Sequence, residues 1–214
     1  MVEKLTLAQK AFEKLEEMIV NLHLRPGQVY SEKELTQLLG FGRTPLREAL
    51  QKMANIDLLE IIPRRGIKIS EIILYRQLAI LETRRPLDEL IAKCATRRST
   101  DEQKKKLIEM AEEMEKAVKE SHVQEYLRLD HAFDELLDQA SRNKFTTRAL
   151  DPLHIHCRRF WVAYQRYDNM DQAAILHEKL MRAVATGNEE ISAKAANELV
   201  DYFVEFTRKA LDIN

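Results

Sequence analysis

Apolar residues recur every three to four positions along most of this 214-residue chain, which is the spacing of helices with one buried face. After residue 70 this pattern continues to the end and is interrupted only by short polar stretches. It predicts about six helices, at 71–98, 101–120, 122–140, 144–166, 170–186 and 189–211. Short connections favour antiparallel neighbours, so we expect an all-helical antiparallel bundle in this half.

The first 70 residues have a different pattern, in which two short helices follow one another closely. Ser31 and Glu34 form the sequence signature of a capping box that opens the first of them. Gly40 ends it, since glycine adopts the positive φ common at helix C-termini. Thr44 is expected to cap the second helix, with Pro45 at its first position. This spacing predicts a helix-turn-helix.

A basic hairpin is predicted directly after the second helix. Residues 58–62 and 67–69 are short apolar or alternating runs typical of strands, and the turn 63–66 joins them. The turn carries Arg64 and Arg65, which suits contact with phosphates or a narrow minor groove. The unit is therefore predicted to be a winged helix-turn-helix.

Two arginines also stand near the start of the second helix. Arg43 and Arg47 are four residues apart, so both can project from its exposed N-terminal end. Basic side chains at this place are how such units read the DNA major groove. The fold class is thus mainly α, with a DNA-binding domain at 1–70 and a helical effector-binding and dimerisation domain at 71–214.

Composition limits the possible settings of the protein. The chain is 45% hydrophobic and 32% charged, with a net charge of −1, so DNA binding depends on where the charges lie and not on their sum. Its two cysteines have no CxxC spacing, which favours reduced thiols. The N-terminus does not look like a signal peptide, and no segment approaches a membrane span. We expect a cytoplasmic protein with no membrane contact.

The motifs S-E-x-E-L, R-T-P-x-R-E-A-L and P-x-R-G, over about residues 7–70, resemble the DNA-binding domain of the GntR family of bacterial regulators. The resemblance implies binding of double-stranded DNA by a homodimer. The residues it matches to DNA contacts are Lys33, Arg43, Thr44, Arg47, Arg64, Arg65 and Gly66. The chain departs from the family at Asp57, where glycine is usual, and aspartate tolerates the left-handed turn expected there better than most residues.

Residues 71–211 more weakly resemble the FCD effector domain of the FadR branch, in its six-helix, VanR-like form. The family pattern is an aspartate, a histidine four residues later and two histidines on later helices, a set that often binds a divalent metal. Asp130 and His177 match two of these positions, whereas Asp134 and Leu199 replace the other two histidines. The resemblance also makes Arg84 the candidate clamp for a small carboxylate effector.

Two outcomes remain open for this set. Asp130, Asp134 and His177 could still hold Zn, Ni or Mn with help from water or an effector. Alternatively the metal is lost, and the two carboxylates are balanced by a proton or by Arg84. His154 and His156 lie inside a predicted helix and point about 200° apart, so they are interpreted as incidental. His131 is interpreted as a packed neighbour.

The sequence thus predicts a ligand-responsive transcription regulator that binds a palindromic operator as a homodimer and responds to a small organic acid. Two alternatives belong to other classes of protein. One is a hydrolase-like enzyme with a metal at Asp130, Asp134 and His177, for which no separate nucleophile or phosphate loop is visible. The other is a helical scaffold protein. We predict that the protein is not an enzyme.

Overall fold

The computed structural model describes residues 5–165 and 170–212. Its internal contacts divide it into two compact units. The first extends to Ile73 and also includes Ile155–Ala163, and the second comprises Leu74–His154 together with the chain from Tyr164 onwards. Each unit is described separately below.

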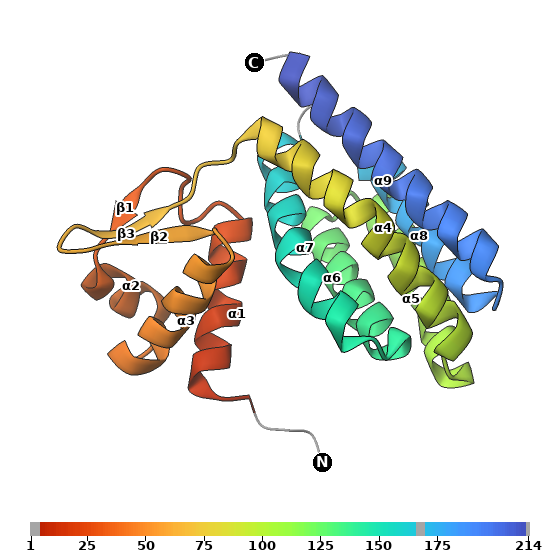
Figure 1. Cartoon of the computed structure of the whole chain (residues 1–214), viewed down its shortest axis with the longest axis horizontal. Helices are drawn as coiled ribbons and strands as arrows, with labels where there is room; N and C mark the ends of the chain where they lie inside the picture. The colour runs from red at the N-terminus through yellow and green to blue at the C-terminus, as the bar shows by residue number, and fades with distance from the viewer. Residues whose placement is uncertain (1–4, 166–169, 213–214) are drawn as a thin grey trace. The chain divides into compact units, whose positions relative to one another are not determined.

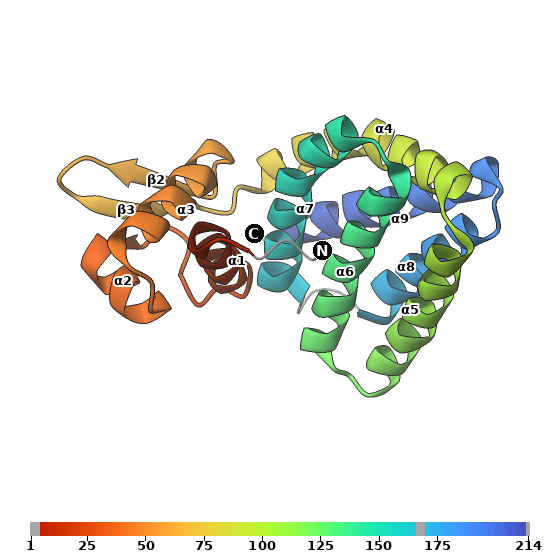
Figure 2. The ribbon, with the colours of Figure 1, turned by 90° about the horizontal axis from the view of Figure 1, so that it is seen from below.

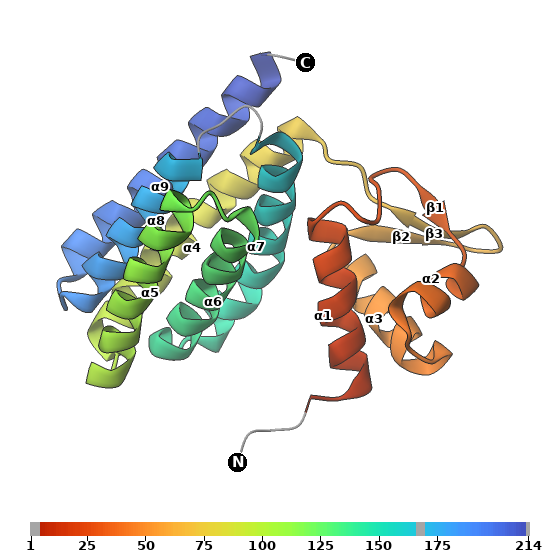
Figure 3. The same ribbon diagram turned by 180° about the vertical axis from the view of Figure 1, so that it is seen from behind.

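The first unit is a helix-turn-helix with a small sheet. Its elements are α1 (Leu7–Val20), β1 (Val29–Tyr30), α2 (Glu32–Leu39), α3 (Arg43–Asn55), β2 (Leu59–Ile62) and β3 (Gly66–Ile69). The sheet is antiparallel in the order β1-β3-β2 (Figure 3). The predicted hairpin is β2 and β3, and the third strand, β1, has only two residues, which is too short for the sequence pattern to indicate. The predicted winged helix-turn-helix is confirmed.

The predicted capping residues explain most of the boundaries in this unit. Ser31 and Glu34 form the reciprocal capping box, and Gly40 ends α2 with a φ of 74°. The predicted start of α3 is wrong by about two residues. The helix begins at Arg43 with Gly42 as its N-cap, so Thr44 lies inside the first turn and makes no capping hydrogen bond. Gly42 has the extended backbone conformation of an N-cap residue, so the helix begins directly after it.

The core of the first unit lies between α1 and α3, which pack together, with the sheet at its edge (Figure 1). Apolar residues at helical spacing supply it, as the periodicity predicts. Its fully buried members include Ala11, Leu15, Ile19, Leu35, Leu46, Met53, Leu58 and Ile69. This core fixes α3 under the wing and leaves the first turn of α3 exposed.

The six predicted helices are all present, and they belong to the second unit except for Ile155–Ala163 of the fourth, which belongs to the first. They are α4 (Leu74–Arg98), α5 (Asp101–Lys119), α6 (Val123–Ser141), α7 (Lys144–Tyr164), α8 (Met170–Ala185) and α9 (Glu189–Asp212). These bounds differ from the predicted ones by three residues at most. The predicted end of the fourth helix at residue 166, and the break at 168–169, lie outside the described residues.

Within the second unit, α4 packs against α9 and α6, while α5 packs against α6 and α8 (Figures 1 and 2). The centre of the bundle is therefore approached by α4, α6 and α8 together. Thr100 and Gln103 form a capping box that starts α5 directly after α4 ends. Over the two described stretches, no helix is long and apolar enough to cross a membrane.

Candidate DNA-reading surface and candidate effector site

The predicted DNA-contacting residues lie on the exposed side of the first unit. Arg43 and Thr44 are the first two residues of α3, Arg47 follows one turn later, and Lys33 stands on α2. All four are exposed. The first turn of a helix leaves backbone N–H groups without helical partners, so cationic side chains and positive backbone dipoles coincide here. This arrangement suits an approach to phosphates and base edges.

Arg47 has an acidic neighbour on the preceding helix. Its Nε donates to both carboxylate oxygens of Glu32, at 2.9 and 3.0 Å. The Arg47 side chain is 68% exposed, so the pair is solvated and costs little to break. Glu32 therefore orients the guanidinium across the front of α3 without withdrawing it from the surface.

The wing presents its two arginines at a strained turn. Arg64 has a φ of 63°, and both Arg64 and Arg65 are exposed. Gly66, with a φ of 123°, begins β3, and a Cβ built on it would lie 2.5 Å from the carbonyl oxygen of Tyr30. Only glycine lets β3 approach β1 so closely. Gly66 thus has a structural role in the wing, and its predicted contact with DNA stays a prediction.

The second unit contains a chain of buried ion pairs at its centre. Arg84 Nε donates to Oδ2 of Asp88 at 3.0 Å, one turn along α4. Oδ1 of Asp88 lies 3.2 Å from Nε2 of His154 on α7. The other ring nitrogen of His154, Nδ1, lies 2.9 Å from Oδ2 of Asp134 on α6. The imidazole therefore bridges two carboxylates and links three helices.

Electrostatics favours the charged forms of His154 and Asp88. Burial alone would lower the pKa of His154, but the charge of Asp134 and the hydrogen bonds to Asp134 and Asp88 outweigh it and raise the pKa to about 9. Burial alone would raise the pKa of Asp88, but Arg84 and His154 outweigh it and the pKa is lowered. At neutral pH His154 is thus an imidazolium and Asp88 a carboxylate.

A second buried pair joins α8 to α6. His177 Nε2 lies 2.8 Å from Oδ1 of Asp130, and His177 Nδ1 lies 2.8 Å from the carbonyl oxygen of Ala173. Burial would lower the pKa of His177, but the hydrogen bond to Asp130 and its charge raise the pKa. The ring is surrounded edge-on by the aromatic rings of Tyr126, Phe133 and Phe203.

Of the three predicted metal ligands, the structure therefore brings Asp130 and His177 into contact and directs Asp134 to His154. Within residues 5–165 and 170–212, no group of three His, Cys, Asp or Glu side chains is arranged to hold a metal ion. Leu199 is buried and has no ligand atom. As they stand, the donors do not fit the metal that the domain pattern implies. Arg84, the predicted effector clamp, lies in the same buried chain and also faces the ring of Phe203, at 5.8 Å.

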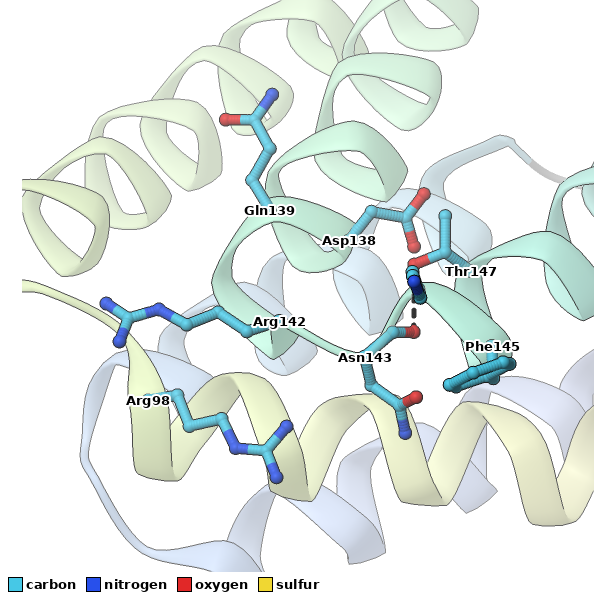
Figure 4. Close-up of a pocket in the computed structure, with 8 residues that line it drawn as sticks. Arg98, Asp138, Gln139, Arg142, Asn143, Phe145 and Thr147 are labelled. Atoms are coloured by element: carbon cyan, nitrogen blue, oxygen red, sulfur yellow. Dashed lines mark hydrogen bonds between the residues drawn. The ribbon is translucent and has the colours of Figure 1, made fainter.

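The carboxylate row on α6 continues beyond Asp134. Asp138, one turn further on, lines an open pocket of about 760 Å³ with Arg98, Asn143, Phe145 and Thr147. Figure 4 shows the Asp138 carboxylate beside Thr147, and the main-chain oxygen of Asn143 accepts a hydrogen bond from the Thr147 hydroxyl. Burial and the negative charge of Asp151 raise the pKa of Asp138 to about 7.

His154 is the residue that sequence reasoning missed. His154 and His156 do point in different directions, as expected for residues two apart on a helix. The role of His154 depends instead on its ion-pair partners Asp88 and Asp134, which lie on other helices and far away in sequence. The only local signal was the four-residue spacing of Arg84 and Asp88 on α4, which matches Asp130 and Asp134 on α6. His131 does not pack against the core as predicted, since it lies half-exposed beside Glu135.

A winged helix-turn-helix followed by a helical domain with buried polar residues defines a class of DNA-binding regulators. The family model "Bacterial regulatory proteins, gntR family" matches residues 7–69, and the FCD domain model matches residues 79–202. The chain belongs to the GntR family of bacterial regulators and carries an FCD domain. The predicted family is thereby confirmed.

Characterised and uncharacterised relatives agree with this assignment. The HTH-type regulator YdhC of Bacillus subtilis is 30% identical over 69% of this chain and 67% of its own length. The repressor RspR of Escherichia coli is 25% identical over 78% of this chain and 73% of its own length. The structure of E. coli McbR/YncC shares the fold, with a TM-score of 0.85 and 16% identity over 97% of this chain and all of that chain.

These families and relatives are transcription regulators. The chain is therefore a transcriptional regulator with an FCD ligand-binding domain, and the prediction that it is not an enzyme is confirmed.

Proposed function

We propose that the protein binds a short palindromic operator as a homodimer and that a small carboxylate changes its affinity for this DNA. The observation that carries the proposal is the exposed basic row on α3 and the wing, in a unit whose other face is a packed core. An exposed row of this kind has no structural role in the core. It suits a duplex, which offers phosphates and base edges at matching places.

Some of these residues would contact bases and so recognise the sequence, and others would contact phosphates and so position the protein on the DNA. Arg43, Thr44 and Arg47 would enter the major groove with the first turn of α3, and Lys33 would contact the phosphates beside it. Arg64 and Arg65 would follow the adjacent minor groove, with the backbone of Gly66 close to the DNA. Arg47 would leave Glu32 on binding, since an exposed ion pair is exchanged at small cost.

A dimer would suit the way in which winged helices read an operator. One winged helix covers only a few base pairs, whereas two units related by a two-fold axis read two half-sites about one helical turn apart. A dimer would have twice the 25.0 kDa mass of this chain. DNA binding also implies that the protein works in the bacterial cytoplasm.

The effector would be a small organic acid received by Arg84. The guanidinium of Arg84 is buried and pairs with Asp88 through Nε, so an incoming carboxylate would compete with Asp88 or share the arginine with it. Asp88 is joined to His154 and thus to α6 and α7, so this exchange would change how three helices are held. Arg84 supplies the positive charge, and the proposal needs no metal.

Fluorescence anisotropy with labelled DNA from upstream of the regulator's own gene tests the proposal. We expect saturable binding at moderate salt by a species of dimer mass in sedimentation. We also expect acetate, succinate or citrate to change the affinity of the native protein and not that of Arg84→Ala. Binding that does not distinguish this DNA from an unrelated duplex would contradict the operator, and a monomer bound to one half-site would contradict the dimer.

A further inference from the structure

His154 is placed as an internal cation at the centre of the second unit. A neutral imidazole has one N–H and one lone pair, but both ring nitrogens of His154 face carboxylate oxygens, at 2.9 and 3.2 Å. Its side chain is only 8% exposed, so water cannot replace either partner. Both nitrogens must therefore donate, and the ring carries a positive charge.

His177 has only one carboxylate beside its ring. One nitrogen faces the Asp130 carboxylate and the other faces the carbonyl oxygen of Ala173, which can only accept. A metal at Nε2 would take the place of that proton beside Asp130, while the Nδ1–H bond to Ala173 would persist, because such a bond orients ligating histidines. His177 alone therefore does not exclude a metal, and the positions of its neighbours decide.

The basic side chains of the ion-pair chain and of the His177–Asp130 pair already lie against carboxylates. Arg84 and His154 lie against Asp88, His154 also lies against Asp134, and His177 lies against Asp130. The six side chains are joined in contacts of 2.8 to 3.2 Å. A divalent cation would have to enter beside these basic side chains, which is unfavourable in a low-dielectric interior.

The directions of the donors point to the same conclusion. Asp88 and Asp134 approach opposite sides of the His154 ring, so their oxygens cannot converge with a ring nitrogen on one point. Leu199 offers no donor where α9 passes this region, one turn before Phe203, whose ring contacts His177. A metal needs donor atoms that converge on one point, whereas here Asp134 is paired with His154 and Asp130 with His177.

We propose that His154 takes the place of a divalent metal in this domain: bridging Asp88 and Asp134, it joins α4, α6 and α7 as an internal cation, and the core binds no metal. The inference concerns the construction of the helical domain and does not depend on the operator, the dimer or the effector proposed above.

The first experiment measures metal binding by the chelator-stripped wild-type protein. We titrate Zn²⁺, Ni²⁺ and Mn²⁺ separately by calorimetry and expect each dissociation constant to exceed about 100 µM. We also expect none of the three ions to give a saturable rise in melting temperature. Stoichiometric binding of any of them at lower concentration, lost in His177→Ala, would overturn the proposal. Weak binding that persists in His177→Ala would belong to the surface and would support it.

A second measurement observes the proton positions directly. In the native protein at neutral pH, ¹⁵N NMR of the histidine rings should show both nitrogens of His154 protonated, and Asp134→Asn should abolish this signature. A single protonated nitrogen on His154 in the wild type would overturn the bridge, whatever the metal titrations show.

A gain of function provides the matched control. Asp134→His removes a partner of His154, and Leu199→His adds an imidazole beside His177. The double variant should bind Zn²⁺ at least about 100-fold more tightly than the wild type, because Asp130, His177 and two new imidazoles then form a zinc-type donor set. Leu199→His alone should not do so. An equal gain in this single variant would mean that the native donors already converge, and would overturn the proposal.

Discussion

The two units of this protein use their positive charges in opposite ways. On the first unit, Arg43, Arg47 and the wing arginines are exposed, and the Arg47–Glu32 pair is solvated. In the second unit, Arg84 is buried against Asp88, and His154 is buried between Asp88 and Asp134. Exposed charges cost little to hold and to redirect, whereas buried ones are costly to leave without a partner. The first arrangement suits binding to a partner, and the second holds helices together.

The sharpest test of this contrast is His154→Ala. Removing the imidazolium leaves Asp88 and Asp134 buried with one partner fewer each, and we expect the free energy of unfolding to fall by about 3–5 kcal/mol. Urea denaturation of the native and variant proteins at pH 7 measures it. The control is His131→Ala, whose ring is half-exposed beside Glu135 and should change stability by less than about 0.5 kcal/mol. Similar losses in both variants would remove the distinction.

The same contrast explains what the sequence could and could not predict. The elements of the first unit depend on neighbours within a few residues, such as Ser31 with Glu34 and the φ of Gly40, so local motifs suffice. The bridge of His154 joins residues 66 and 20 positions apart, and no local pattern encodes such a pairing. Helix boundaries in the second unit were predictable, but the contacts between facing helices were not.

The dependence of stability on pH should report on the buried charge of His154 in the second unit. The folded pKa of His154 is about 9, above its ordinary value, so its stabilisation is complete below about pH 6.5 and is lost as the pH rises through 9. The groups facing it are Arg84 and Asp88 on α4, and Asp134 and Asp138 on α6. We expect a loss of roughly 3 kcal/mol across this range.

The pH experiment has an internal check. Asp138 has a pKa raised to about 7, so its unfavourable ionisation lowers stability between about pH 4 and 7, before His154 begins to lose its proton. Urea denaturation between pH 5 and 9.5 should show the two declines, with Asp138→Asn removing the first and His154→Gln the second. Stability that is constant above pH 7 in the wild type would contradict a charged His154.

In the first unit the largest effect should come from the backbone and not from charge. Gly66→Ala places a Cβ 2.5 Å from the Tyr30 carbonyl oxygen at a φ of 123°, and we expect a loss of about 2–3 kcal/mol with separation of β1 from β3. Gly40→Ala is the control, because its φ is also positive but nothing lies within 4 Å, so only about 1 kcal/mol is expected. Thermal melts of both variants measure the difference.

Exposed charges should affect binding and leave stability nearly unchanged. Arg47→Ala should weaken operator binding by roughly 1–3 kcal/mol and relax base preference if Arg47 reads a base. Arg65→Ala should instead weaken all sequences alike and flatten the salt dependence if it contacts phosphate. Anisotropy with the operator and a scrambled duplex at several salt concentrations distinguishes them. Glu32→Gln should leave stability within about 1 kcal/mol, as for a solvated pair.

The smallest expected effect lies at the turn between α3 and β2. Asp57 has a φ of 59°, as predicted, and its N–H donates to the carbonyl oxygen of Ala54. Glycine would relieve the left-handed strain but add freedom to the unfolded chain, so Asp57→Gly should stabilise the first unit by at most about 1 kcal/mol. Denaturation midpoints of Asp57→Gly and Asp57→Asn measure it, since asparagine keeps the shape and tolerance of the left-handed turn without the charge. If Asp57→Gly instead destabilises the protein and Asp57→Asn does so equally, the carboxylate itself contributes to this unit. An exposed charge would then have the kind of structural role that the comparison assigns only to the buried charges of the second unit.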